Sequence, residues 1–240
     1  MSEFGGFTVL SFDCYGTLID WESGILAQLQ SWAGRHGLAL GHKELLAAFA
    51  QVETQVEQET TPAPLYPQVL AECLRRIGEG LGADVSTEEA TTFGDSVGEW
   101  PAFPDSAKAL ARLKERFRLV IVSNVDRDSF AASNRRLGVE FDRVITAEDV
   151  GAYKPQLLHF QALLAVLREW EVEPSQLLHV AQSLYHDHEP AARLGLASVW
   201  IDRRHEQEGF GATPVPRGSV APWWRFPDLA SFADQALAGP

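Results

Sequence analysis

Short apolar runs of strand length recur along the chain, and each is bounded by polar or turn-forming residues. The predicted strands cover residues 7–12, 119–122, 144–147, 177–181 and 197–201. From the second strand onward, stretches with apolar residues at helical spacing separate the strands, at 130–137, 157–170 and 190–194. Strands and helices that alternate in this way are typical of a parallel sheet covered on both faces. The pattern therefore predicts an α/β fold.

The interval between the first two predicted strands is far longer than a single crossover helix requires. Within it, apolar residues at helical spacing predict helices around residues 25–32, 45–56 and 69–77. We therefore predict a small helical domain at residues 20–100, inserted into an α/β core that is made of residues 1–19 and 101–240.

Several polar residues stand where predicted helices begin. Asp20 is placed to cap the first inserted helix, and Ser86 with Glu89 has the spacing of a capping box for a fourth. Asp105 is predicted to cap the helix that leads back into the sheet. A last short helix is expected around residues 229–237.

The composition narrows the class of protein. Over 240 residues, 20 Lys and Arg stand against 33 Asp and Glu, a formal net charge of -13, so nucleic acids and anionic membrane surfaces are not expected partners. The two cysteines, Cys14 and Cys73, are too few for a disulfide framework or a tetrahedral zinc site. The N-terminal residues do not resemble a signal peptide, and no apolar run is long enough to span a bilayer. We therefore expect a cytoplasmic protein.

Polar side chains follow four of the predicted strands, where the carboxyl ends of parallel strands bind ligands. They are Asp13, Ser123, Asn124, Lys154, Ser183 and Asp187. Each alone is also compatible with a turn, a helix cap or a solvated surface charge. Together, two carboxylates, hydroxyl and amide groups and a cation can supply a nucleophile, substrate donors and a base. A lysine between two carboxylates offsets their repulsion.

Four short segments resemble, in order, the motifs of the haloacid dehalogenase-like (HAD) hydrolase superfamily. They are Asp13-Cys14-Tyr15-Gly16-Thr17-Leu18, Ser123-Asn124, Lys154-Pro155 and Ser183-Leu184-Tyr185-His186-Asp187. Four motifs in the right order and strand context are far more specific than a single short motif. The resemblance implies a Rossmann-like parallel sheet core with an inserted small α-helical cap domain.

The resemblance also implies roles for individual residues. Asp13 would be the nucleophile that forms an ester with the substrate, Lys154 would hold the carboxylates, and Asp187 would position or activate the hydrolytic water. Ser183 is grouped with these catalytic residues. The implied substrate-binding residues, some of which would also orient Asp13, are Tyr15, Thr17, Ser123, Asn124 and His186.

Two positions distinguish between branches of the superfamily. Tyr15 stands where the phosphatases usually have a second Asp, and Gln182 stands where they usually have an acidic magnesium ligand. A Tyr followed by Gly-Thr, together with Asp20-Trp21, resembles the metal-free L-2-haloacid dehalogenases of type II. The resemblance therefore implies no metal ligands and no cofactor.

Three positions depart from that dehalogenase pattern. Residues 49–53 contain no arginine to receive a halide, Phe160 replaces a tyrosine, and Leu184 replaces an asparagine. The expected function is metal-independent displacement of a halide or similar group from a small 2-substituted carboxylic acid through an aspartyl ester. Two alternatives remain, a Mg²⁺-dependent phosphomonoester phosphatase and an inert member that binds a small anion or a protein. A homodimer is the default assembly.

Overall fold

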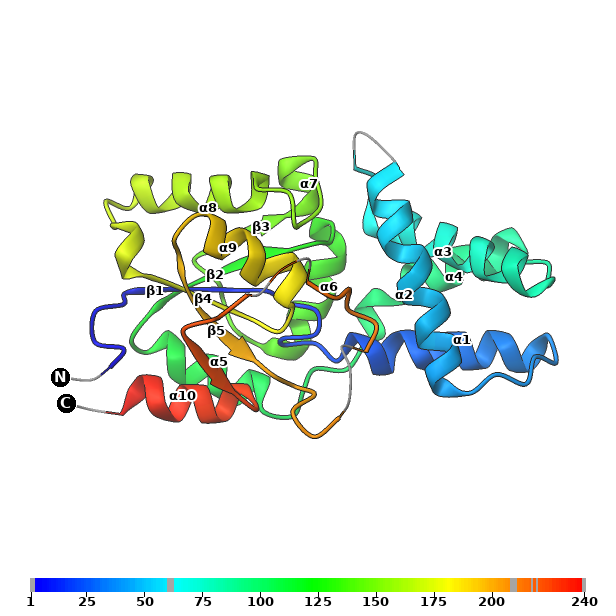
Figure 1. Ribbon diagram of the computed structural model, residues 1–240, viewed down its shortest axis with the longest axis horizontal. Helices are drawn as coiled ribbons and strands as arrows, with labels where there is room; N and C mark the ends of the chain where they lie inside the picture. The colour runs from blue at the N-terminus through cyan, green and yellow to red at the C-terminus, as the bar shows by residue number, and fades with distance from the viewer. Residues whose placement is uncertain (1–2, 60–62, 208–210, 217, 219, 239–240) are drawn as a thin grey trace.

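The core of the protein is a six-stranded sheet in which every neighbouring pair of strands is parallel (Figure 1). The computed structural model describes residues 3–59, 63–207, 211–216, 218 and 220–238. The strand order is β3-β2-β1-β4-β5-β6. The strands are β1 Val9–Phe12, β2 Arg118–Ser123, β3 Arg143–Thr146, β4 Leu177–Ala181, β5 Ala197–Ile201 and β6 Trp224–Phe226. The α/β class predicted from the apolar pattern is therefore confirmed.

The edge strand β6 is the strand that the apolar pattern does not predict. It has only three residues, too few for a two-residue period to be recognised. In the structure it pairs with β5, and the Trp224 ring lies 4.9 Å from the Phe4 ring, centroid to centroid. Contacts with the distant N-terminal segment therefore help to place this strand at the sheet edge.

Helices cover both faces of the sheet, and a short helical turn follows two of the strands. One face packs against α5 Ser106–Lys114, α6 Arg127–Leu137 and α10 Leu229–Leu237. The other face packs against α8 Leu158–Glu169 and α9 Glu189–Arg193. The shorter elements are α7 Ala147–Val150, the 3₁₀ turn η2 Pro174–Gln176 and the π-helical turn η3 Leu184–His188. The predicted helices of the core are present.

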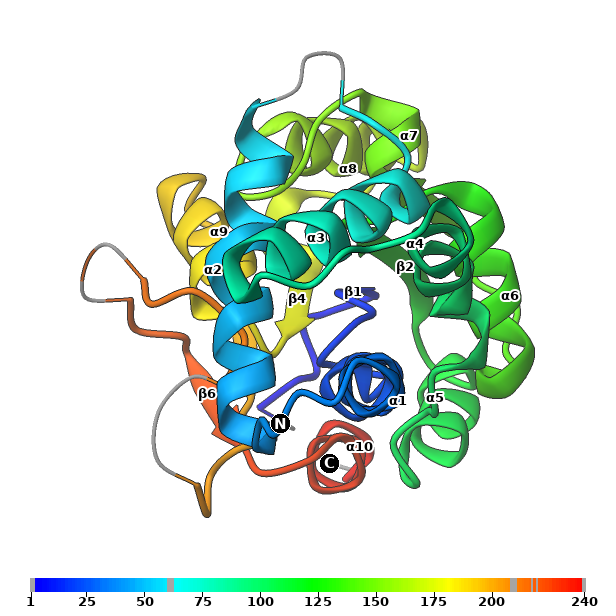
Figure 2. The same ribbon diagram turned by 90° about the vertical axis from the view of Figure 1, so that its right-hand side faces the viewer.

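The long interval after β1 forms a separate group of helices beside the carboxyl ends of the strands, here called the helical unit (residues 21–99; Figures 1 and 2). Its elements are α1 Trp21–Arg35, α2 His42–Glu59, α3 Tyr66–Leu81, α4 Thr87–Gly94 and η1 Asp95–Glu99. Gly24 permits close packing of α1 against Trp100, the residue that follows this unit, because a Cβ there would lie 2.3 Å from Trp100 Cγ. Among the described residues, no helix is long and apolar enough to cross a bilayer.

Two of the three predicted helix caps form as expected. The Asp20 carboxylate accepts from the Ser23 backbone N–H at the start of α1, at 3.2 Å. Ser86 and Glu89 form the reciprocal capping box of α4. These caps were predictable because donor and acceptor lie within three residues of each other.

The third prediction, that Asp105 caps α5, is wrong. Asp105 precedes α5, but its side chain makes no capping bond there, because its backbone is already in the helical region. Its Oδ2 instead accepts from the backbone N–H groups of Leu229, at 2.8 Å, and Ala230, at 3.1 Å. Both of its oxygens also accept from Arg203. Asp105 therefore caps α10, which is more than 120 residues away in sequence.

Candidate active site

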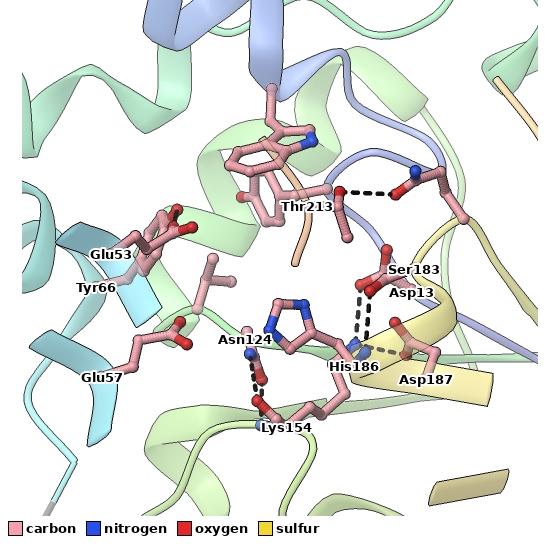
Figure 3. A pocket seen from close by; sticks show the side chains of 14 residues that line it. Asp13, Glu53, Glu57, Tyr66, Asn124, Lys154, Ser183, His186, Asp187 and Thr213 are labelled. Atoms are coloured by element: carbon pink, nitrogen blue, oxygen red, sulfur yellow. Dashed lines mark hydrogen bonds and ion pairs between the residues drawn. The ribbon is translucent and has the colours of Figure 1, made fainter. Parts of the chain in front are cut away.

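The polar side chains at the carboxyl ends of the strands meet in a pocket between the sheet and the helical unit (Figure 3). The pocket encloses about 480 Å³ of space, part of it open to solvent. From the core it is lined by Asp13, Tyr15, Asn124, Val125, Lys154, Gln182, Ser183, His186, Asp187 and Thr213. From the helical unit it is lined by Trp21, Glu53, Glu57 and Tyr66. A parallel sheet brings these residues together because all its strands end on one side.

Lys154 is the central cation of the pocket and is 1% exposed. Its Nζ donates to Asp13 Oδ1 at 2.9 Å, Asp187 Oδ1 at 2.8 Å and the Val122 carbonyl at 2.8 Å. These three bonds use all three protons of the ammonium group. Burial alone lowers the pKa of Lys154, but the two carboxylates outweigh it and raise the pKa to about 12. The lysine is therefore charged at neutral pH, and it has no donor left for another ligand.

Asp13 lies directly after β1 and is held at both oxygens. Oδ1 accepts from Lys154, and Oδ2 accepts from the Thr17 hydroxyl at 2.8 Å. The Thr17 oxygen in turn accepts from the Gln182 backbone N–H at 2.9 Å, which fixes the direction of the hydroxyl proton. Burial raises the pKa of Asp13, and Lys154 opposes that shift by favouring the ionised form. The carboxylate is thus oriented before any substrate binds.

Asp187 lies in η3 after β4 and is held at one oxygen. Its Oδ1 accepts from Lys154 and from His179 Nε2, the latter at 3.1 Å, while His179 Nδ1 is 2.8 Å from the Ser11 hydroxyl oxygen. Burial works against ionisation, but Lys154 and His179 hold the pKa of Asp187 well below its usual range. Its Oδ2 is buried without a hydrogen-bond partner among the described residues. Asp187 therefore presents one unused acceptor oxygen beside Asp13 (Figure 3).

His179 is a residue of this network that the sequence reasoning missed. It lies on β4, and its side chain bridges β1 and η3 through Ser11 and Asp187. The residue is fully buried. Its position within a predicted apolar strand was the one available signal, because a buried histidine normally needs hydrogen-bond partners.

The predicted substrate-binding residues divide into two groups. Asn124, His186 and Tyr15 line the pocket. Thr17 and Ser123 lie behind the lining: Thr17 contacts Asp13, and the buried Ser123 hydroxyl has no hydrogen-bond partner among the described residues. Burial lowers the pKa of His186 to about 4, so its imidazole is neutral at pH 7.

Three of the predicted polar groups have structural partners. The Asn124 side chain accepts from the Lys154 backbone N–H at 2.7 Å and donates to the Lys154 carbonyl at 3.2 Å. The Ser183 hydroxyl oxygen accepts from the His186 backbone N–H at 2.9 Å. The Tyr15 hydroxyl lies 2.8 Å from the Ser133 hydroxyl oxygen, on α6. The contacts of Asn124 and Ser183 fix the loops that carry Lys154 and Asp187, and the contact with Ser133 holds the Tyr15 hydroxyl against α6.

Two glutamates of α2 form the wall of the pocket that faces Asp13, and the sequence analysis did not single them out as site residues. Glu53 and Glu57 are four residues apart, so they share one helix face. They are 6% and 9% exposed. Tyr66 donates to Glu53 at 2.7 Å, whereas Glu57 has no hydrogen bond or ion pair among the described residues. Burial raises the pKa of Glu53 to about 7, and burial together with Glu53 raises that of Glu57 well above its usual range.

The residues at the carboxyl ends of the strands do not fit a magnesium site. Magnesium prefers octahedral oxygen ligands that include carboxylates. Here Asp13 and Asp187 each give one oxygen to Lys154, and the neutral Gln182 side chain accepts from Thr213 at 3.3 Å. Within the described part of the chain, no group of three or more His, Cys, Asp or Glu side chains has the arrangement needed to hold a metal ion.

Replacing Glu53 by glutamine should change how stability depends on pH. The folded pKa of about 7 exceeds the ordinary value of 4.5, so between these values the native state binds a proton that the unfolded chain does not. The stabilising contribution of Glu53 is therefore complete below pH 4.5 and is lost as pH rises through 7, about 3 kcal/mol in all. Glutamine stays neutral. Relative to wild type, the free energy of unfolding of Glu53→Gln should thus rise by about that amount from pH 4.5 to 8.

Urea unfolding of both proteins across this pH range measures that difference. His186, whose pKa burial lowers to about 4, also contributes to the pH dependence of stability, but it is common to both proteins and its contribution cancels. The matched control is Glu59→Gln on the same helix, because Glu59 is exposed and pairs with Arg76. A difference between Glu53→Gln and wild type that does not change with pH would contradict the assignment of a buried, protonated Glu53.

The chain matches one protein family and is similar in structure to several solved proteins. Residues 7–195 match the family model of haloacid dehalogenase-like hydrolases. An L-2-haloacid dehalogenase structure is similar with a TM-score of 0.76 and 22% identity, covering 97% of this chain and 100% of that one. A defluorinating L-2-haloacid dehalogenase has a TM-score of 0.75 and 22% identity, covering 99% and 98% of the two chains.

A third structure carries a bound molecule. It is the L-2-haloacid dehalogenase from Xanthobacter autotrophicus with chloropropionic acid covalently bound, which has a TM-score of 0.77 and 19% identity and covers 98% of this chain and 100% of that one. No curated protein matches the sequence significantly. At these identities the structural likeness shows a shared fold, whereas the family match covers most of the chain.

Proposed function

The chain belongs to the haloacid dehalogenase-like hydrolases, and from this premise we propose that it hydrolyses a small 2-substituted carboxylic acid through a covalent aspartyl ester, without a metal ion. The observation that carries the proposal is the buried Lys154, which binds Asp13 and Asp187 together at the pocket. Such a lysine favours the ionised forms of two neighbouring carboxylates. The helical unit is proposed to act as the cap of this site.

In the first step, an oxygen of Asp13 attacks the substrate carbon that carries the leaving group. A carbon–oxygen ester bond forms, and the halide or similar group departs with the electron pair of its own bond. Lys154 and Thr17 hold the carboxylate in place, so the attacking oxygen is positioned before the substrate arrives. Formation of the ester converts the negatively charged carboxylate of Asp13 into a neutral group.

In the second step, water attacks the carboxyl carbon of the ester. Asp187 takes a proton from this water through Oδ2, the buried oxygen that the protein leaves without a partner. Lys154 stabilises the negative charge that develops on the oxygen of Asp13. The ester bond then breaks, the proton held by Asp187 passes to the departing alkoxide, and the product leaves as a 2-hydroxy acid. Asp13 keeps one oxygen atom from water.

Similar structures support this assignment at the level of the fold. Two of them are L-2-haloacid dehalogenases, one described as defluorinating, and another holds covalently bound chloropropionic acid. In the present proposal, attack by Asp13 on a 2-halo acid would likewise bind the substrate covalently. The proposal transfers this chemistry to the present chain through the contacts of Asp13, Lys154 and Asp187.

A substrate screen with and without chelator tests the proposal. We expect turnover of a 2-halo acid or fluoroacetate to be unchanged by excess EDTA, because Asp13 and Asp187 each already give one oxygen to Lys154 and the side chain of Gln182 is neutral. Phosphomonoesters should not be turned over. A phosphatase activity that EDTA removes, magnesium restores and Asp13→Asn abolishes would overturn the proposal in favour of metal-dependent phosphoryl transfer.

A further inference from the structure

We propose that Glu53 and Glu57 form a binding site for a protonated amino group, so that the substrate is a small carboxylic acid that also carries an ammonium group. This inference extends the proposed function. The chemistry at the end of the substrate that reacts with Asp13 rests on that proposal. The ammonium site itself is argued from the helical unit. It lies across the pocket from Asp13 (Figure 3).

The charges that line the pocket favour a cationic ligand group. Four carboxyl groups line it, from Asp13, Glu53, Glu57 and Asp187. Lys154 is the single lysine or arginine among the described lining residues, and the two aspartates and the Val122 carbonyl already use its protons. No lysine or arginine among the described lining residues forms an ion pair with Glu53 or Glu57, and burial favours the protonated forms of both. An ammonium group on the ligand provides the counter-charge that allows them to ionise.

Glu57 is the observation that points to a ligand. Its side chain is aimed into the pocket (Figure 3), it is 9% exposed, and it has no hydrogen bond or ion pair among the described residues. Polar side chains that are about nine-tenths buried usually have a hydrogen-bond partner in the protein, so a carboxyl group without one that opens onto a cavity points to a partner on a ligand. An ammonium group offers three donors, which suits a carboxyl group that only accepts when ionised.

The surroundings of the two glutamates suit an organic cation. Tyr66 donates to one oxygen of Glu53, and this leaves the other oxygen available. Tyr66 and Trp21 line the same pocket, and aromatic faces attract ammonium groups. A metal ion is a poorer fit, since the described residues contain no group of three or more possible ligands arranged to hold one.

Calorimetric titration of wild-type protein with matched pairs of ligands tests the site. Each of 3-aminopropionate, 4-aminobutyrate and 5-aminopentanoate is compared with propionate, butyrate or pentanoate of the same length. None of these has a leaving group, so the result does not depend on chemistry at Asp13. At least one amino acid should bind at least about tenfold more tightly than its partner, and a double Glu53→Gln and Glu57→Gln variant should lose this preference.

Two further proteins complete the experiment. Glu59→Gln removes a carboxylate from the same helix outside the pocket and should keep the preference. Asp13→Asn should also keep it, so a failure of the proposed reaction is distinguished from a failure of the ammonium site. Because glutamine replaces a buried acid with a neutral group of the same shape, the double variant should remain folded, as thermal unfolding will show.

Three results would overturn the inference. The first is equal binding of each ligand pair, or no binding of any amino acid at saturating concentration. The second is a preference for the amino acids that survives in the double variant. The third is tight binding of Mg²⁺ or Ca²⁺ alone that the double variant loses, because it would assign the glutamates to a metal ion.

Discussion

Asp13→Asn should lower the turnover number by about 10⁴-fold or more and leave the fold intact, because an amide cannot replace a carboxylate as a nucleophile. The substitution keeps the size and shape of the side chain. The amide can still accept from Thr17 or Lys154 through its oxygen. Steady-state kinetics and thermal unfolding measure the two effects separately. Asp128→Asn, at an exposed position on α6, is the matched control and should retain full activity.

Isotope labelling identifies the nucleophile directly. In a single turnover in ¹⁸O-labelled water with enzyme in excess, the heavy oxygen should enter the Asp13 carboxylate, because water attacks the carboxyl carbon of the ester. The first product should carry the unlabelled oxygen that came from Asp13. Mass spectrometry of the peptide that contains Asp13 measures the incorporation. Label found in the first product and absent from Asp13 would show that water attacks the substrate directly.

Lys154→Met should reduce both activity and stability. The methionine fills similar volume, but it leaves Asp13 and Asp187 buried beside each other without a cation. Removing one partner of a buried ion pair typically costs about 3–5 kcal/mol of stability. Activity should fall by about 10²–10³-fold, since the developing charge on the ester loses its stabilising group. Urea unfolding and steady-state kinetics measure the two losses.

The pH dependence of Lys154→Met gives a specific signature. A nearby positive charge lowers the pKa of a carboxyl group, so its removal raises the pKa values of Asp13 and Asp187. The acid limb of the remaining activity should therefore shift to higher pH. Lys108→Met, at an exposed position on α5, should change neither the activity nor the pH profile. A Lys154 variant with near-normal activity at neutral pH would remove this lysine from the mechanism.

Local patterns along the chain were sufficient to predict the core of the fold and to single out the residues that meet at the centre of the candidate site. Five of the strands were predicted because apolar runs of strand length require neighbours only a few residues away. Asp13, Lys154 and Asp187 were found because each follows a strand of a parallel sheet, and such a sheet collects these positions at one edge. The caps at Asp20 and Ser86 likewise depend on partners within three residues.

Only the tertiary structure decided which residues of the helical unit face Asp13, Lys154 and Asp187. Glu53 and Glu57 were recognisable as one helix face, but whether α2 turns this face to solvent or to the pocket depends on how it packs against the other helices and the sheet. The contacts of Asp105 with α10 and of His179 with Asp187 were likewise not predictable, because in each case the partner belongs to another element of the fold. Hydrogen bonds and burial between distant segments depend on three-dimensional distance, and a periodic pattern of residues carries no information about that distance.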